Sequence, residues 1–120
     1  MIFDFKKFCS IAAGVFPDST YTFNEAMCVF RRFFAAYEEH TRRPHPPIKA
    51  SQIARIIEDM PLIDVGEDRP FIYVSASDYP AIIDMYFTTE YKNCDYNINH
   101  FFSGKVRKMK YFEARRDGLL

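Results

Sequence analysis

The clearest pattern of apolar and polar positions runs from Thr22 to His40. Apolar side chains recur there at the intervals of an amphipathic helix, so they fall on one face. Thr22 and Glu25 have the spacing of a capping box, which predicts that the helix begins there. Burying each large side chain gains about 1.5–3 kcal/mol, so we expect this face to form the centre of the core. Its members are Phe23, Ala26, Met27, Phe30, Phe33, Phe34 and Tyr37.

Weaker periodic stretches predict further helices over residues 4–13, 50–60 and 78–89, and a last one from about residue 97. Asp4 is a candidate cap for the first of these, and Gly14 a candidate left-handed end. In the last helix one side is expected to be apolar and turned inward. It consists of Ile98, Phe101, Phe102, Val106, Met109 and Phe112. Ser103-Gly104 interrupts this helix and could instead split it into two.

Residues 71–74 form a short apolar run that predicts a strand, but the sequence does not identify a partner for it. That partner could be another segment or a second subunit. Residues 61–69 are read as an acidic loop, and the prolines between Pro44 and Pro47 as an extended connector. The prediction is a mainly α fold. We expect residues 1–120 to form a single domain, a compact bundle of about five helices in which the central helix packs against the first, third and last.

Charge is balanced overall but unevenly distributed. Lys plus Arg and Asp plus Glu both number 16. Residues 1–55 carry 8 basic and 5 acidic side chains, residues 56–91 carry 1 and 8, and residues 92–120 carry 7 and 3. An acidic middle between basic ends is self-complementary, so charge favours self-association of copies as well as binding of another protein.

Location follows from hydropathy and cysteine usage. The longest uncharged apolar run is far shorter than the ~20 residues of a spanning helix, and lysines interrupt the apolar N-terminal stretch. We therefore expect no membrane association. Cys9, Cys28 and Cys94 are odd in number and widely spaced, which is typical of reduced thiols. The expected location is the cytoplasm.

Candidate chemistry is sparse. The metal-ligand types His40, His45, Cys94, Asp95 and His100 do not have the spacing of a zinc motif, so we expect no metal. Cys94 and His100 could act as nucleophile and base, but no flanking signature supports that pairing. The chain also has no glycine-rich phosphate loop or nucleotide fingerprint. We expect neither cofactor nor small-molecule substrate, and no enzymatic activity.

Cys28 has two interpretations. It lies opposite the phenylalanine face of the central helix, with Arg32 one turn away, and a nearby cation favours the reactive thiolate. Alternatively, Val29, Ala35 and Ala36 indicate that this side is also covered, which would make Cys28 a small buried apolar residue. A redox-sensing thiol protein is therefore the third functional hypothesis.

The leading functional hypothesis is a small non-catalytic binding module that acts through protein contacts. The alternative is an accessory nucleic-acid-binding protein of the replication or transcription type. A standard helix-turn-helix is disfavoured, because residues 61–77 make too long a linker. If the apolar side of the last helix turns inward, its basic side could contact phosphates and stack on a base. The candidate binding residues are Arg107, Lys108, Lys110, Tyr111 and Arg115.

Overall fold

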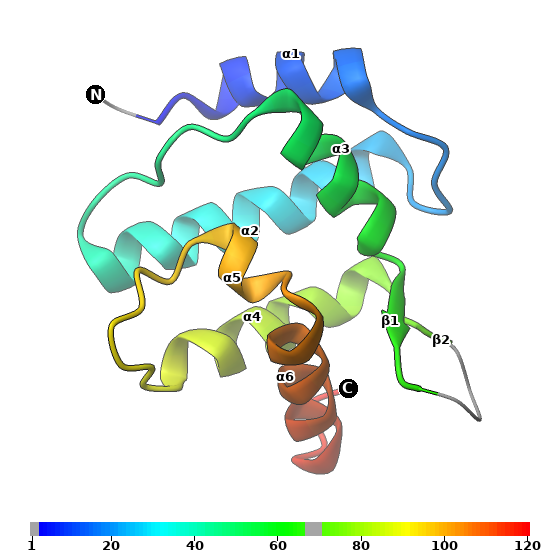
Figure 1. Ribbon diagram of the computed structural model, residues 1–120, viewed down its shortest axis with the longest axis vertical. Coiled ribbons are helices and arrows are strands. Elements are labelled where there is room, and N and C mark those ends of the chain that lie inside the picture. The colour runs from blue at the N-terminus through cyan, green and yellow to red at the C-terminus, as the bar shows by residue number, and fades with distance from the viewer. Residues whose placement is uncertain (1–2, 67–70) are drawn as a thin grey trace.

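The computed structural model describes residues 3–66 and 71–120 and is 61% helical. Within that part of the chain, six α-helices, one short 3₁₀ helix and a two-stranded sheet confirm the predicted mainly α fold with a short strand. Figure 1 shows α1 across one end of the long axis and α6 extending toward the other. The elements are α1 (Phe5–Val15), α2 (Phe23–Thr41), α3 (Ala50–Asp59), β1 (Leu62–Asp64), β2 (Phe71–Tyr73), η1 (Ala76–Asp78), α4 (Tyr79–Thr88), α5 (Ile98–Phe101) and α6 (Gly104–Arg116).

The central helix α2 begins as predicted. Thr22 Oγ1 accepts a hydrogen bond from the Glu25 backbone N–H at 3.1 Å, and Glu25 Oε1 accepts one from the Thr22 N–H at 2.8 Å. These bonds form the capping box and satisfy amides that have no partner within the helix. At the other end, Arg42 adopts a left-handed φ of 62° and its N–H donates to the Glu38 carbonyl.

The first helix confirms one predicted end and corrects the other. Asp4 Oδ1 accepts from the backbone N–H groups of Lys6 and Lys7, at 3.0 and 3.2 Å, as expected of a cap. The predicted end at Gly14 is wrong, because α1 continues to Val15. Val15 is partly buried against the core, and this packing holds the last turn in helical form.

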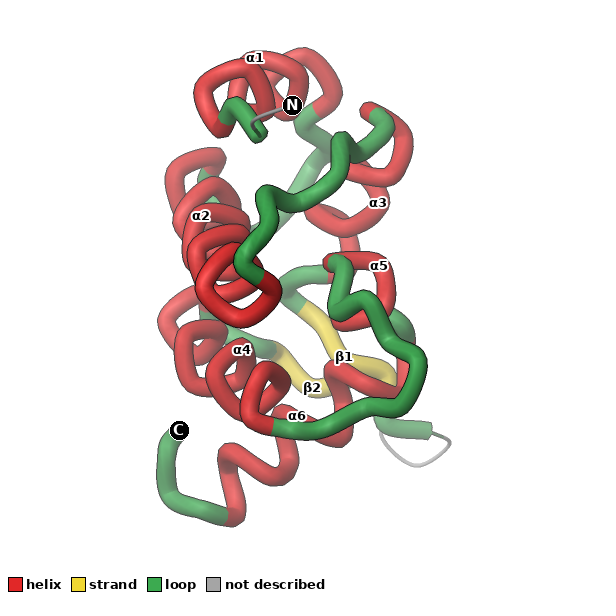
Figure 2. Tube along the Cα trace, turned by 90° about the vertical axis from the view of Figure 1, so that its left-hand side faces the viewer, coloured by secondary structure: helices red, strands yellow, loops and turns green. Residues whose placement is uncertain are grey.

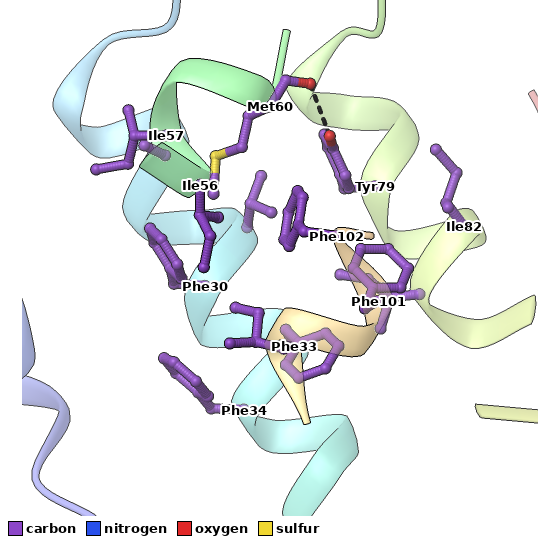
Figure 3. Packing of buried hydrophobic residues seen from close by; sticks show 14 of the residues in the cluster. Phe30, Phe33, Phe34, Ile56, Ile57, Met60, Tyr79, Ile82, Phe101 and Phe102 are labelled. Carbon is purple, nitrogen blue, oxygen red and sulfur yellow. Dashed lines mark hydrogen bonds between the residues drawn. The ribbon is translucent and has the colours of Figure 1, made fainter. Parts of the chain in front are cut away.

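The core is centred on the phenylalanines of α2, as predicted. Phe30 and Phe33 are fully buried, and the Phe33 ring lies 5.3 Å from that of Phe101 in α5. Figure 3 shows side chains from α2, α4 and the regions of α3 and α5 packed together there. The labelled neighbours include Ile56, Ile57 and Met60 from the α3 region, Tyr79 and Ile82 from α4, and Phe101 and Phe102.

The short strand finds its partner within the chain. β1 pairs antiparallel with β2, with Leu62 opposite Tyr73 and Ile63 opposite Ile72. The prediction of a loop is therefore wrong for β1, which is too short to show a periodic pattern. The acidic residues Glu67 and Asp68 lie outside the described residues. Figure 2 shows the two strands in the same half of the molecule as α6, away from α1.

The last predicted helix is divided. Ser103 and Gly104 separate α5 from α6, so the alternative of two shorter helices is the one observed. α5 packs against α2 through Phe101, whereas α6 packs on α4 and β1. The predicted contact between the central helix and the last segment therefore holds for α5 alone. This division lets the chain change direction, and it sets which side of α6 is buried.

Candidate functional site

The buried side of α6 is the opposite of the one predicted. Met109 is 56% exposed and Phe112 is also exposed, while Arg107, Lys110 and Tyr111 are buried. The expected inward apolar face is therefore wrong for Met109 and Phe112, whereas Val106 packs partly buried against the core as predicted. α6 packs on α4 and β1 rather than on the phenylalanines of α2. Its buried basic side chains therefore lie against the ends of α3 and α4.

Arg107 occupies the junction between α3 and the sheet. Its Nη1 donates to the Asp59 carbonyl at 2.6 Å and its Nη2 to the Leu62 carbonyl at 2.8 Å. The guanidinium also lies 5.3 Å from the centre of the Phe102 ring. The carbonyls at the end of a helix carry partial negative charge, so this cation caps α3. Arg107 is buried and cannot contact a phosphate.

Lys110 and Tyr111 are also committed to internal packing. Lys110 Nζ donates to Thr89 Oγ1 at 2.7 Å and to Glu113 Oε2 at 2.9 Å, which ties α6 to the end of α4. The Tyr111 ring packs beside Phe112, at 5.4 Å between centres. Of the five predicted binding residues, Arg115 is exposed and Lys108 partly exposed. The five do not form one accessible face.

The outer edge of β2 is open. In an antiparallel pair, residues that exchange both backbone hydrogen bonds alternate with residues that exchange none. Val74 N–H donates to the Pro61 carbonyl, so Ile72 is the next residue bonded to β1, and the backbone groups of Phe71 and Tyr73 point away. Within residues 3–66 and 71–120, nothing pairs with these outward groups.

The side chains along this edge are large and apolar. Phe71 is 56% exposed, Tyr73 is 57% exposed, and Leu62 lies opposite Tyr73 on the same exposed face. We call Phe71 and Tyr73 the aromatic edge. The other strand differs, because the carbonyl of Leu62 on the outer side of β1 is bonded to Arg107. One carbonyl on the outer side of β1 therefore has a partner, whereas within the described residues the outward groups of β2 have none.

A second feature lies in the loop between α4 and α5. Cys94 Sγ is 3.4 Å from His100 Nδ1, and the Tyr86 hydroxyl is 2.7 Å from the same nitrogen. The Tyr96 backbone N–H donates to Cys94 Sγ at 3.2 Å. Burial, reinforced by Cys94, raises the pKa of the Tyr86 phenol, so the hydroxyl stays protonated. The sequence contained both Cys94 and His100, but only the fold brings them together.

This loop is held in an unusual conformation. Asn93 and Tyr96 have left-handed φ values of 53° and 59°, a region that costs a residue other than glycine about 1–3 kcal/mol. The buried Tyr96 side chain balances this cost, because its hydroxyl donates to the Thr89 carbonyl and accepts from the Tyr91 N–H, both at 2.8 Å. The positions of Cys94 and His100 are thus fixed by packing.

The remaining sequence candidates are separate. Cys28 is exposed, so the expectation that it is a small buried residue is wrong, and Arg32 is engaged with Asp84 at 2.7 Å. His45 is buried and its Nε2 accepts from the Ile98 N–H at 3.0 Å. The His40 ring lies 4.5 Å from the Tyr96 ring and is tilted by 52° to it. Among the described residues no group of three or more ligand-type side chains could hold a metal.

No family model, curated protein or solved structure matches this chain. The described part of the chain has no helix long and apolar enough to cross a membrane. Two features of the site had weak sequence signals. The apolar run in residues 71–74 predicted a strand but not an open edge, and nothing in the sequence indicated that Arg107 would be buried.

Proposed function

We propose that the protein is a small non-catalytic binding module that acts through protein contacts, and that the aromatic edge is its contact surface. The observation that carries this proposal is that the outward backbone groups of β2 have no partner among residues 3–66 and 71–120, while two aromatic side chains on the same strand are exposed. An extended segment of a partner could add to this edge as a further strand. Its backbone would supply affinity, and its side chains would pack on Phe71 and Tyr73.

Three properties support this choice. An open apolar edge favours aggregation, and natural sheets commonly block such edges with charged side chains. Here Phe71 and Tyr73 carry no charge, while Arg107 protects the carbonyl of Leu62 on the opposite edge. Aromatic side chains are also enriched at protein interfaces, because they bury a large area with little loss of conformational freedom.

The occupant we propose is a segment of another protein, and self-association is the alternative. Two copies of β2 could pair about a two-fold axis at Ile72, which would place Phe71 opposite Tyr73 of the second copy. Nucleic-acid binding has weaker support, because Arg107, Lys110 and Tyr111 are buried and only Lys108 and Arg115 are left from the predicted set. We place the module in the cytoplasm, since Cys9, Cys28 and Cys94 are free.

The first experiment traps the partner in cells. A photo-crosslinking phenylalanine analogue is placed at position 73, with the same analogue at position 109 as a control of equal exposure on α6. We expect one defined crosslinked protein from position 73, and none when Phe71→Lys is added to the same chain. Equal crosslinking from both positions, or none from position 73, would contradict the proposal.

The second experiment separates the alternatives. Sedimentation of the purified protein over a range of concentrations tests self-association, and Tyr73→Lys should leave the protein monomeric and folded. Dimerisation that is abolished by Tyr73→Lys would identify a second copy as the occupant. Gel shift with duplex DNA and RNA at low salt tests the alternative function, and Arg115→Glu should weaken any complex formed.

A further inference from the structure

We infer that Cys94 and His100 form an activated thiol site that reacts with small hydroperoxides such as hydrogen peroxide. The site lies in the loop between α4 and α5 and is independent of the aromatic edge. It rests on three geometric facts: the short Sγ to Nδ1 distance, the backbone donor aimed at the sulfur, and a hollow that opens onto the pair.

The imidazole is placed to take the thiol proton. Cys94 Sγ and His100 Nδ1 are 3.4 Å apart, a distance suited to a sulfur-to-nitrogen hydrogen bond. The thiolate, and not the thiol, is the reactive form of cysteine, and a protonated imidazole beside it favours that form. The Tyr96 N–H donates to the sulfur at 3.2 Å and also favours a negative charge there.

A small reagent can reach the sulfur. A hollow of about 410 Å³ is lined by Tyr91, Lys92, Asn93, Cys94, Asp95 and His100. Cys94 is partly exposed within it, so the thiol is neither sealed in the core nor freely mobile on the surface. Asn93 and Tyr96, which have left-handed backbone conformations, flank Cys94 and shape the loop in which it lies.

The reaction balances with the peroxide as the only co-reactant. The Cys94 proton moves to His100 Nδ1, and the thiolate attacks one peroxide oxygen, so that an S–O bond forms and the O–O bond breaks. Sulfur loses two electrons, which the peroxide gains. The departing hydroxide takes the proton from His100 and leaves as water. The product is a sulfenic acid on Cys94 beside a neutral imidazole.

Tyr86 regulates this step through the shared nitrogen. Its hydroxyl lies 2.7 Å from His100 Nδ1, and when it donates there it occupies the lone pair that the thiol proton needs. Removing this hydroxyl should therefore free the imidazole to act as the base. Tyr86→Phe retains the buried ring and is expected to make Cys94 react faster.

The test compares the three cysteines within one molecule. Iodoacetamide is applied to the folded full chain at pH 6.5, and mass spectrometry follows each cysteine separately. Cys28 is the more exposed thiol, so simple access predicts that it reacts first. We expect Cys94 to react at least about tenfold faster than Cys28, because an imidazole and a backbone N–H lie beside its sulfur. Cys94 reacting no faster than Cys28 would overturn the inference whatever the variants show.

Variants then assign the cause. His100→Gln should slow Cys94 to the rate of Cys28, while His40→Gln, which removes an imidazole near the same loop, should not. An unchanged rate in both His100→Gln and Tyr86→Phe would overturn the role of the imidazole. The partly buried Cys9 reports on folding, because its rate rises if a variant opens the core. Hydrogen peroxide followed by dimedone should label Cys94 before Cys28, and preferential labelling of Cys28 would contradict the peroxide reaction.

Discussion

Arg107 Nη1 donates to the hydroxyl of Tyr79 at 2.8 Å, and that hydroxyl donates to the Met60 carbonyl at 2.6 Å. This chain of bonds joins α6, α4 and the end of α3. Burial raises the pKa of Tyr79 to about 12, although Arg107 opposes the rise, so the hydroxyl stays protonated and continues to donate. The connection explains why a basic residue of α6 is 6% exposed.

Replacement of Arg107 should therefore affect stability more than binding. Arg107→Met leaves the carbonyls of Asp59 and Leu62 without their donor, and hydrogen bonds to charged groups contribute about 1.5–3 kcal/mol. We expect a loss of that size in the free energy of unfolding, measured by urea denaturation. Arg115→Met is the matched control and should change stability by less than about 0.5 kcal/mol. Equal effects of the two substitutions would show that Arg107 is not a structural residue.

Phe33 should be among the most costly positions to truncate. Its ring is fully buried among rings from α4 and α5, and Phe→Ala substitutions in cores cost about 3–5 kcal/mol. Phe112→Ala removes the same atoms from an exposed site on α6 and should cost little. Thermal melts of the two variants measure the difference. A Phe33→Ala protein that melts like the parent would contradict the assigned core.

The capping box of α2 should show coupling between its two members. Thr22→Ala is expected to cost about 0.5–2 kcal/mol, because the Glu25 N–H loses its acceptor. Glu25→Ala should add less than its own separate cost in the double variant, since each side chain serves the same helix end. A double-mutant cycle in urea measures the coupling. Strict additivity would argue against a cooperative box.

His45 should make stability depend on pH. Its Nδ1 lies 2.8 Å from the Pro46 carbonyl and its Nε2 accepts from Ile98, an arrangement that requires the neutral ring. Burial lowers the pKa of His45, while the Pro46 carbonyl and Asp95 oppose that change. Below about pH 6.5 the unfolded chain then binds more protons than the folded one. The contribution of His45 to the free energy of unfolding is therefore complete above that pH and is lost as the pH falls below it.

This dependence is measured by melting temperature between pH 8 and pH 5. We expect His45→Asn to flatten the fall, although the variant is less stable at pH 8 because the Ile98 amide loses a well-placed acceptor. His40→Asn alters an exposed histidine and serves as the control. If the parent and His45→Asn lose stability in parallel, other groups account for the pH dependence.

Local patterns were enough to predict where α1 and α2 begin and that further helices follow. The capping pairs Thr22 with Glu25 and Asp4 with Lys6 and Lys7 act over three residues or fewer, so neighbours in sequence determine them. The phenylalanines of α2 were predictable for the same reason, since helical periodicity depends on the chain alone. The strand at residues 71–74 was predicted from its apolar run, but its partner Leu62–Asp64 was not.

Tertiary structure decided which surfaces remain accessible. In sequence, α6 has the basic and apolar sides of an ordinary amphipathic helix. In the fold, Arg107 is buried because it binds the carbonyls of Asp59 and Leu62, and Met109 is exposed. Cys94 and His100 meet because Tyr96 fixes the loop between them. The sequence by itself determined the helices and the centre of the core, because those depend on local spacing. The open edge of β2 and the thiol pair depend on contacts between distant segments, which only the folded chain establishes.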